Sequence, residues 1–71
     1  MGFNVKIFGG RLKELRTEKG MNTIQLGEAL GFSGATISRW ENGKRNPCVD
    51  SIYVIAKFFN VSAGYLIGLE D

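Results

Sequence analysis

Residues 22–47 read NTIQLGEALGFSGATISRWENGKRNP, a stretch in which apolar side chains recur at helical spacing on both sides of Gly31. This pattern predicts two short helices joined by a tight glycine turn. Asn22, with Gln25 three residues later, is typical of a capping box that begins the first helix. Ser33 is the expected N-cap of the second helix.

The same periodicity predicts three further helices, over about residues 10–19, 49–59 and 63–68. No segment alternates in period two, so strands are not expected. The predicted fold class is therefore all-α, a compact five-helix domain that spans residues 1–71. The expected inward positions, helix by helix, are Phe8, Leu12, Leu15 and Arg16; Ile24, Leu26, Ala29 and Leu30; Ile37, Trp40 and Glu41; and Val49, Ile52, Tyr53, Ala56 and Phe59.

The composition excludes several functional classes. A chain of 71 residues with one cysteine and no histidine cannot build a zinc finger, a Ser-His-Asp triad or a Cys-His protease site from its own residues. We expect no enzyme activity, no metal and no cofactor. The longest apolar run is too short to cross a bilayer, and the first residues lack the features of a signal peptide. We therefore expect a cytoplasmic protein without membrane contact.

Positive charge is concentrated in the first two thirds of the chain. Residues 1–46 carry eight of the nine lysines and arginines but four of the seven acids, a balance of +4, whereas the remaining residues have a balance of −2. This asymmetry is compatible with a polyanionic partner on one side. On charge alone, a solvated basic face is the simpler interpretation.

The segment from about Phe8 to Leu69 closely resembles the Xre/Cro-type helix-turn-helix domain of phage repressors and related bacterial regulators. This resemblance implies a lambda-repressor-like fold, with the motif at about residues 22–43. In such a domain the first motif helix lies across the DNA backbone and the second enters the major groove. The residues that carry the resemblance are Leu26, Gly31 and Ile37 by their spacing, the run ISRWE at 37–41, and NGK at 42–44 before Pro47.

The resemblance also implies a role for individual residues. Base contacts are implied on the exposed side of the recognition helix, at Gly34, Ala35, Ser38 and Arg39. Phosphate contacts are implied at the start of the first motif helix and in the loop after the second, at Thr23, Asn42, Lys44 and Arg45. Thr23 stands where the family usually has a longer glutamine. In some members an arginine of the first helix pairs with the glutamate that matches Glu41, and here that arginine is Arg16.

Helix geometry agrees with this assignment. If Ile37, Trp40 and Glu41 point inward, Ala35, Ser38, Arg39 and Asn42 lie on the opposite flank. Arg39 is the one long side chain there, and its guanidinium can bind O6 and N7 of guanine. Gly34 offers no side chain and Ala35 only a methyl group, which suits a thymine methyl. We therefore expect sparse base readout that depends in part on DNA shape.

These residues also have plainer interpretations. Arg39 can be a solvated charge on the helix surface, and Lys44 and Arg45 can be solvated loop residues that contact no DNA. Trp40 is expected in the core rather than stacked on a base.

Two residues depart from an ideal helix. Gly27 in mid-helix costs ~1 kcal/mol relative to alanine, and close approach of the neighbouring helix is the expected compensation. Cys48 stands where a serine or aspartate would usually cap the helix over 49–59. It is either a half-buried inert thiol or, with a lowered pKa, a redox-sensitive one.

We predict a sequence-specific regulator that binds double-stranded DNA, a repressor that occupies an inverted-repeat operator as a homodimer. The alternative is a protein-interaction module such as an antitoxin, with a toxin or an antirepressor as its partner. The C-terminal helix has more apolar residues than one inward stripe needs, which predicts a dimer interface there. Its residues are Tyr65, Leu66, Ile67 and Leu69.

Overall fold

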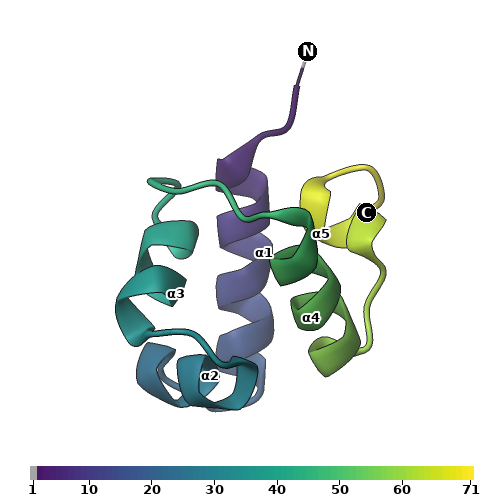
Figure 1. The fold of residues 1–71 in the computed structure, drawn as a ribbon. Coiled ribbons are helices and arrows are strands. Elements are labelled where there is room, and N and C mark those ends of the chain that lie inside the picture. Colours follow the sequence, from purple (N-terminus) through teal and green to yellow (C-terminus); the bar gives the residue numbers. More distant parts are fainter. Residues whose placement is uncertain (1) are drawn as a thin grey trace.

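The computed structural model describes residues 2–71, and within that range it contains helices and no strand. In Figure 1, α1 stands between α3 on one side and α4 with α5 on the other, and α2 lies below. The predicted all-helical, five-helix fold is confirmed. The helices are α1 (Val5–Glu18), α2 (Thr23–Leu30), α3 (Gly34–Glu41), α4 (Val49–Phe59) and α5 (Ala63–Ile67).

Local hydrogen bonds determine where most of these helices begin. The side chains of Asn4, Asn22, Ser33 and Ser62 accept a backbone N–H from the first turn of α1, α2, α3 and α5, respectively. Cys48 occupies the corresponding position of α4 but makes no capping hydrogen bond. Four of the five helix starts are therefore encoded by a short polar side chain.

Helix α1 begins five residues earlier than predicted, at Val5 instead of Gly10. Asn4 supplies the N-cap, because its Oδ1 accepts the backbone N–H of Lys6 at 2.9 Å. The added residues bring Val5 against the core and Phe8 fully into it. Burial of an aromatic ring outweighs the low helix propensity of the adjacent glycines.

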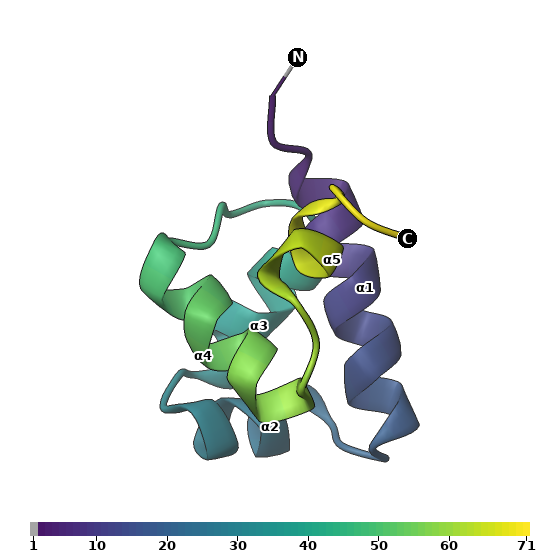
Figure 2. The ribbon, with the colours of Figure 1, turned by 90° about the vertical axis from the view of Figure 1, so that its right-hand side faces the viewer.

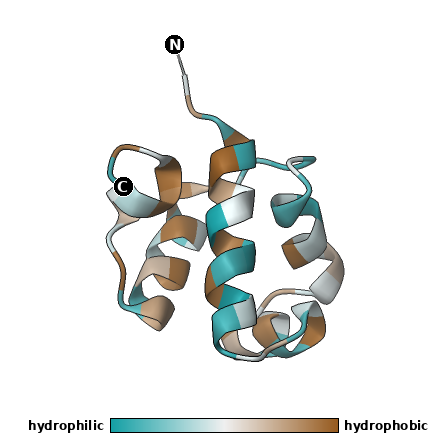
Figure 3. Cartoon of the chain, turned by 180° about the vertical axis from the view of Figure 1, so that it is seen from behind, coloured by the Kyte–Doolittle hydropathy of each residue, from teal (hydrophilic) through white to brown (hydrophobic). Residues whose placement is uncertain are grey.

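The core receives at least one side chain from every helix. Figure 2 shows α5 between α4 and α1, and α5 packs against both. Figure 3 shows hydrophilic and hydrophobic residues alternating along α1, as expected for a helix with one buried face. None of the helices within residues 2–71 has the length and apolar character needed to span a bilayer. The core residues are Phe8, Leu12, Leu26, Ile37, Trp40, Ile55, Ala56 and Leu66.

Helix α4 turns a different face inward from the one predicted. Its buried residues are Ser51, Ile55 and Ala56, whereas Val49 and Tyr53 are exposed. The expectation that Val49 and Tyr53 face the core is therefore wrong. Helix α4 is apolar nearly all round, so periodicity alone does not determine which stripe is buried.

Helix α2 also differs from the prediction. Leu26 is buried as expected, but Ala29 is exposed and Ile24 is 63% exposed. Gly27 is buried, and a Cβ atom there would collide with the carbonyl oxygen of Phe32. The close approach predicted at Gly27 exists, but the turn between α2 and α3 makes it instead of a neighbouring helix.

Candidate nucleic-acid interface

Helices α2 and α3 are joined by a short turn rich in backbone hydrogen bonds. Gly31 ends α2 in the left-handed conformation (φ +86°). The backbone N–H groups of Gly31 and Phe32 both donate to the carbonyl oxygen of Gly27, at 2.8 Å each. Ser33 then begins α3 by accepting the N–H of Thr36 at 3.1 Å. The turn therefore needs the left-handed glycine and the serine cap that the sequence analysis singled out.

The start of α2 carries the predicted capping box. Asn22 Oδ1 accepts the Gln25 N–H at 2.7 Å, and Gln25 Oε1 accepts the Asn22 N–H at 2.9 Å. Thr23 is the first helical residue and is half-buried. It lies at the positive end of the α2 dipole, which favours an anion.

Helix α3 buries one flank and exposes the other. Ile37 and Trp40 are buried, while Ala35 and Arg39 are exposed. The Trp40 ring packs edge-to-face against Phe8 and Phe32, with centroid distances of 6.1 and 5.0 Å. Trp40 is therefore a core residue, as predicted, and it holds α3 with its Arg39 flank toward solvent.

Two polar residues of this flank are linked to each other. Asn42 Nδ2 donates to Ser38 Oγ at 3.3 Å, a connection that the sequence analysis did not foresee. Gly34, at the first position of α3, is half-buried. Of the four residues implied as base contacts, Arg39 is therefore the only one with a long side chain.

Three cationic residues lie in or beside the loop that follows α3. Lys44 and Arg45 are exposed, and the Lys44 N–H donates to the carbonyl oxygen of Arg39 at 2.9 Å. Lys6 lies beside the same loop, with its Cγ 3.0 Å from the position that a Cβ of Gly43 would take. Lys6 was missed because α1 was predicted to begin at Gly10; Asn4 as a helix cap would have revealed it.

A partly buried ion pair ties α1 to the end of α3. Arg16 Nε and Nη2 donate to the two carboxylate oxygens of Glu41 at 2.6 and 2.9 Å, and Arg16 Nη1 donates to the carbonyl oxygen of Met21 at 2.8 Å. The side chains of Arg16 and Glu41 are only 12% and 6% exposed. Hydrogen bonding to Glu41 raises the pKa of Arg16 above its ordinary value. The pair therefore has the predicted partners and is bidentate.

The helix-turn-helix family matches residues 12–66 of this chain. The chain belongs to the Xre/Cro-type helix-turn-helix family. The match begins within α1, at Leu12, and ends within α5, at Leu66; it contains the ion pair, α2, α3 and the loop with Lys44 and Arg45.

Several characterised helix-turn-helix proteins are similar to it. The HTH-type transcriptional activator BcrR of Enterococcus faecalis is 41% identical over 64 residues, which cover 90% of this chain and 31% of BcrR. The P22 c2 repressor, solved with synthetic operator 9T, has a TM-score of 0.82 at 25% identity, covering 89% of this chain and 96% of that one. The restriction-modification controller C.AhdI from Aeromonas hydrophila has a TM-score of 0.79 at 31% identity, covering 87% and 94%. The chain spans between 31% and 54% of the length of the first curated relatives that it matches.

Outside the motif, this helix-turn-helix domain exposes its single thiol. Cys48 is exposed, so the half-buried position considered for it is wrong. Its Sγ lies 3.2 Å from Ser51 Oγ, and this hydrogen bond lowers the pKa of Cys48. Residues 2–71 bring together no group of three or more His, Cys, Asp or Glu side chains that could hold a metal ion.

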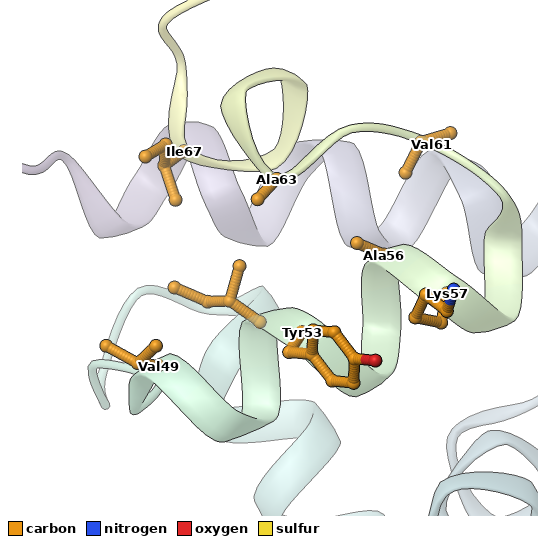
Figure 4. A pocket seen from close by; sticks show the side chains of 8 residues that line it. Val49, Tyr53, Ala56, Lys57, Val61, Ala63 and Ile67 are labelled. Carbon is orange, nitrogen blue, oxygen red and sulfur yellow. The ribbon is translucent and has the colours of Figure 1, made fainter.

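An apolar groove of about 470 Å³ lies between α4 and the α5 region. Figure 4 shows side chains of α4 on one wall and of residues 61–67 on the other, with Lys57 at one end. The groove is lined by Val49 and Tyr53, the two most exposed apolar residues of α4. Its lining residues are Val49, Ile52, Tyr53, Ala56, Lys57, Val61, Ala63 and Ile67.

The residues predicted to form a dimer interface differ in how exposed they are. Leu66 is fully buried in the core and cannot contact another molecule, so that assignment is wrong. Tyr65 is half-buried under the Arg11 guanidinium, which lies 4.4 Å from its ring centroid. Ile67 lines the groove and Leu69 is exposed. The free apolar surface of this region therefore comes from α4 as much as from α5.

Proposed function

We propose that this helix-turn-helix domain binds double-stranded DNA at specific sequences and represses transcription by occupying an operator. The exposed flank of α3 carries this proposal: Arg39 stands free on it, with Lys44 and Arg45 in the loop that follows. A core tryptophan and a partly buried ion pair hold the opposite flank. An exposed guanidinium on a firmly packed helix suits base readout, and flanking cations suit phosphate.

The relatives support a regulator and favour repression. The P22 c2 repressor was solved with an operator, and this chain covers 96% of it. BcrR is an activator, but the chain covers only 31% of its length. The proposed action takes place in the cytoplasm and requires neither a cofactor nor a catalytic step.

The test is to select bound sites from a random duplex library and then compare two variants on the selected and random DNA. Arg39→Ala is expected to cost about 1–3 kcal/mol at the best site and to relax specificity at one position of each half-site. Lys44→Ala is expected to weaken binding to all sequences about equally, because a phosphate contact reads no base. Equal losses on selected and random DNA for Arg39→Ala would overturn the assignment of Arg39.

We also propose that the protein binds DNA as a homodimer on an inverted repeat. One domain of this size offers a single recognition helix and a handful of cations, which is too little for a tight specific site. Two copies related by a two-fold axis would place their half-site centres ~34–36 Å apart, one helical turn of DNA.

The α4–α5 groove is the surface that we propose for this dimer, in place of α5 alone. Asp50 and Lys57 are both exposed on α4 and lie seven residues, or two helical turns, apart. If α4 packs antiparallel against α4 of a second copy, Asp50 of each subunit faces Lys57 of the other. In that arrangement the interface would be complementary to itself in charge as well as apolar in its centre, as a two-fold interface requires.

Charge reversal tests this interface. Asp50→Lys and Lys57→Asp are each expected to weaken self-association and cooperative DNA binding, because each places like charges opposite one another. The double variant restores opposite charges and is expected to recover both, whereas Lys13→Asp on the exposed face of α1 serves as the control. Sedimentation velocity and footprinting measure the outcome. A double variant that stays as monomeric as the single ones would contradict this geometry.

The groove also favours a second candidate function, an antitoxin-like interaction module. An apolar groove between two helices can accept an amphipathic helix of another protein, here a toxin or an antirepressor. Pull-down of a co-encoded protein, blocked by Tyr53→Asp, together with no sequence preference on DNA, would favour this function over repression.

A further inference from the structure

Ile24 is an apolar residue whose side chain does not pack in the core. It was predicted to be buried on α2, yet it is 63% exposed. A single exposed isoleucine needs no explanation by itself. Ile24, however, lies at the junction between the first turn of α2 and the first turn of α3, next to the flank assigned to DNA.

The distances between Gly34 and Ile24 show where the Ile24 side chain lies. A Cβ atom on Gly34 would lie 3.0 Å from Ile24 Cγ1 and 3.3 Å from both Ile24 Cα and Ile24 N. The first turn of α2 therefore rests directly against the first residue of α3. Ile24 occupies the space into which a side chain at position 34 would extend, so α2 supplies the side chain that α3 lacks there.

The junction between α2 and α3 is consequently apolar at three positions. The polar side chains beside it, Ser33 and Thr36, are hydrogen-bonded to each other at 2.9 Å. Gly34 has no side chain, the neighbouring Ala35 exposes a methyl group, and Ile24 adds a branched aliphatic group beside them. In helix-turn-helix domains the N-terminal residues of the recognition helix contact base edges. The C5 methyl of thymine is the apolar group that a base pair presents in the major groove. A polar base edge placed here would lose its water without gaining a hydrogen bond.

We propose that Ile24 is a specificity-determining residue that reads the C5 methyl group of a thymine, together with Ala35. This inference rests on the proposed DNA binding and adds a base contact from α2, the helix otherwise assigned only a phosphate contact. Ile24 selects thymine over cytosine through the methyl group, while Arg39 selects its own base by hydrogen bonding farther along the groove.

Replacement of thymine by deoxyuridine tests the proposal, because it removes the methyl group and leaves the Watson–Crick and groove hydrogen-bonding atoms unchanged. The wild-type protein is first used to select its site from a random duplex library. Each thymine of that site is then replaced in turn. At one thymine per half-site, we expect affinity to fall about fourfold, the value of one buried methyl group.

Two variants locate the methyl contact on the protein. In Ile24→Ala, binding at the selected site is expected to weaken and the deoxyuridine replacement is expected to have almost no further effect. Ile7→Ala is the matched control, because Ile7 is also an exposed isoleucine but lies on α1 beside Gly68. This variant should keep the full deoxyuridine effect. Circular dichroism establishes that both variants are folded.

The outcomes separate the inference from the function on which it rests. A wild-type protein that binds no duplex with sequence preference overturns both. Sequence-specific binding with no deoxyuridine effect at any thymine, or with an effect that persists in Ile24→Ala, overturns the role of Ile24 and leaves DNA binding intact. An effect lost in Ala35→Gly but retained in Ile24→Ala assigns the methyl contact to Ala35 alone and likewise refutes the proposal.

Discussion

Replacing Glu41 by alanine is expected to destabilise the protein by about 3–5 kcal/mol, because it leaves the Arg16 guanidinium buried without its anion. The structure gives the reason for this magnitude. Both side chains are nearly buried, at 12% and 6% exposed, so solvent screens the pair weakly. Two of the three hydrogen bonds of Arg16 disappear, and only the one to the Met21 carbonyl oxygen remains.

This loss is large for so small a domain. At ~0.05–0.15 kcal/mol per residue, a 71-residue domain has a total stability of about 4–11 kcal/mol. The Glu41→Ala variant is therefore expected to lose a large part of its free energy of unfolding. The apolar double variant Arg16→Met, Glu41→Leu should recover much of the stability, because it leaves no buried charge without a partner.

Urea denaturation followed by tryptophan fluorescence measures these differences. Trp40 is the single tryptophan and is buried in the core, so its emission reports unfolding directly. Glu28→Ala is the control, since Glu28 is exposed on α2 and should change stability by less than about 0.5 kcal/mol. A Glu41→Ala variant as stable as Glu28→Ala, or a double variant less stable than Glu41→Ala, would refute this reasoning.

Three further outcomes are expected. The Ser51 hydrogen bond lowers the pKa of Cys48. The alkylation rate of Cys48 should therefore rise with pH at a lower midpoint in the folded protein than in the urea-unfolded chain. Ser51→Ala should move the midpoint of the folded protein upward. Gly27→Ala should destabilise the protein by about 1–3 kcal/mol, because the new Cβ collides with the carbonyl oxygen of Phe32. Gly10→Ala meets no atom within 4 Å and should raise the free energy of unfolding by up to ~1 kcal/mol. Urea titrations measure both changes. If a dimer neutralises about six phosphates, log K should fall with log salt at a slope near −5, and half that slope at saturation would indicate a monomer.

The local parts of the fold could be predicted from sequence because their causes are local. The capping box of α2, the serine cap of α3 and the glycine that ends α2 each depend on residues within four positions of one another. Side-chain hydrogen bonds to nearby backbone groups carry this information. The predicted start of α1 was wrong because Asn4 caps the helix at Val5 and the glycines at positions 9 and 10 do not interrupt it.

Tertiary context determined the remaining differences. Helix α4 offers several apolar stripes, and only packing against the other helices selects Ile55 over Tyr53. Leu66 and Leu69 look equivalent in sequence, yet one is fully buried and the other exposed. The approach of Lys6 to the loop after α3 joins residues far apart in the chain. Periodicity within one helix contains no information about such contacts.

Positions 24 and 34 are expected to change in a fixed order during evolution. A side chain acquired first at position 34 would meet Ile24 Cγ1 at 3.0 Å, closer than carbon atoms pack comfortably. Shortening Ile24 first removes the Cγ1 contact, and the Cα and N of residue 24, which stay 3.3 Å from the new Cβ, then require only a small shift of the two helices. A lineage that switches its preferred base by placing a long residue at position 34 must therefore pass through an ancestor with a small residue at 24. Such an ancestor would be less selective for DNA sequence than either descendant. A switch between two specific repressors would therefore pass through a less specific one.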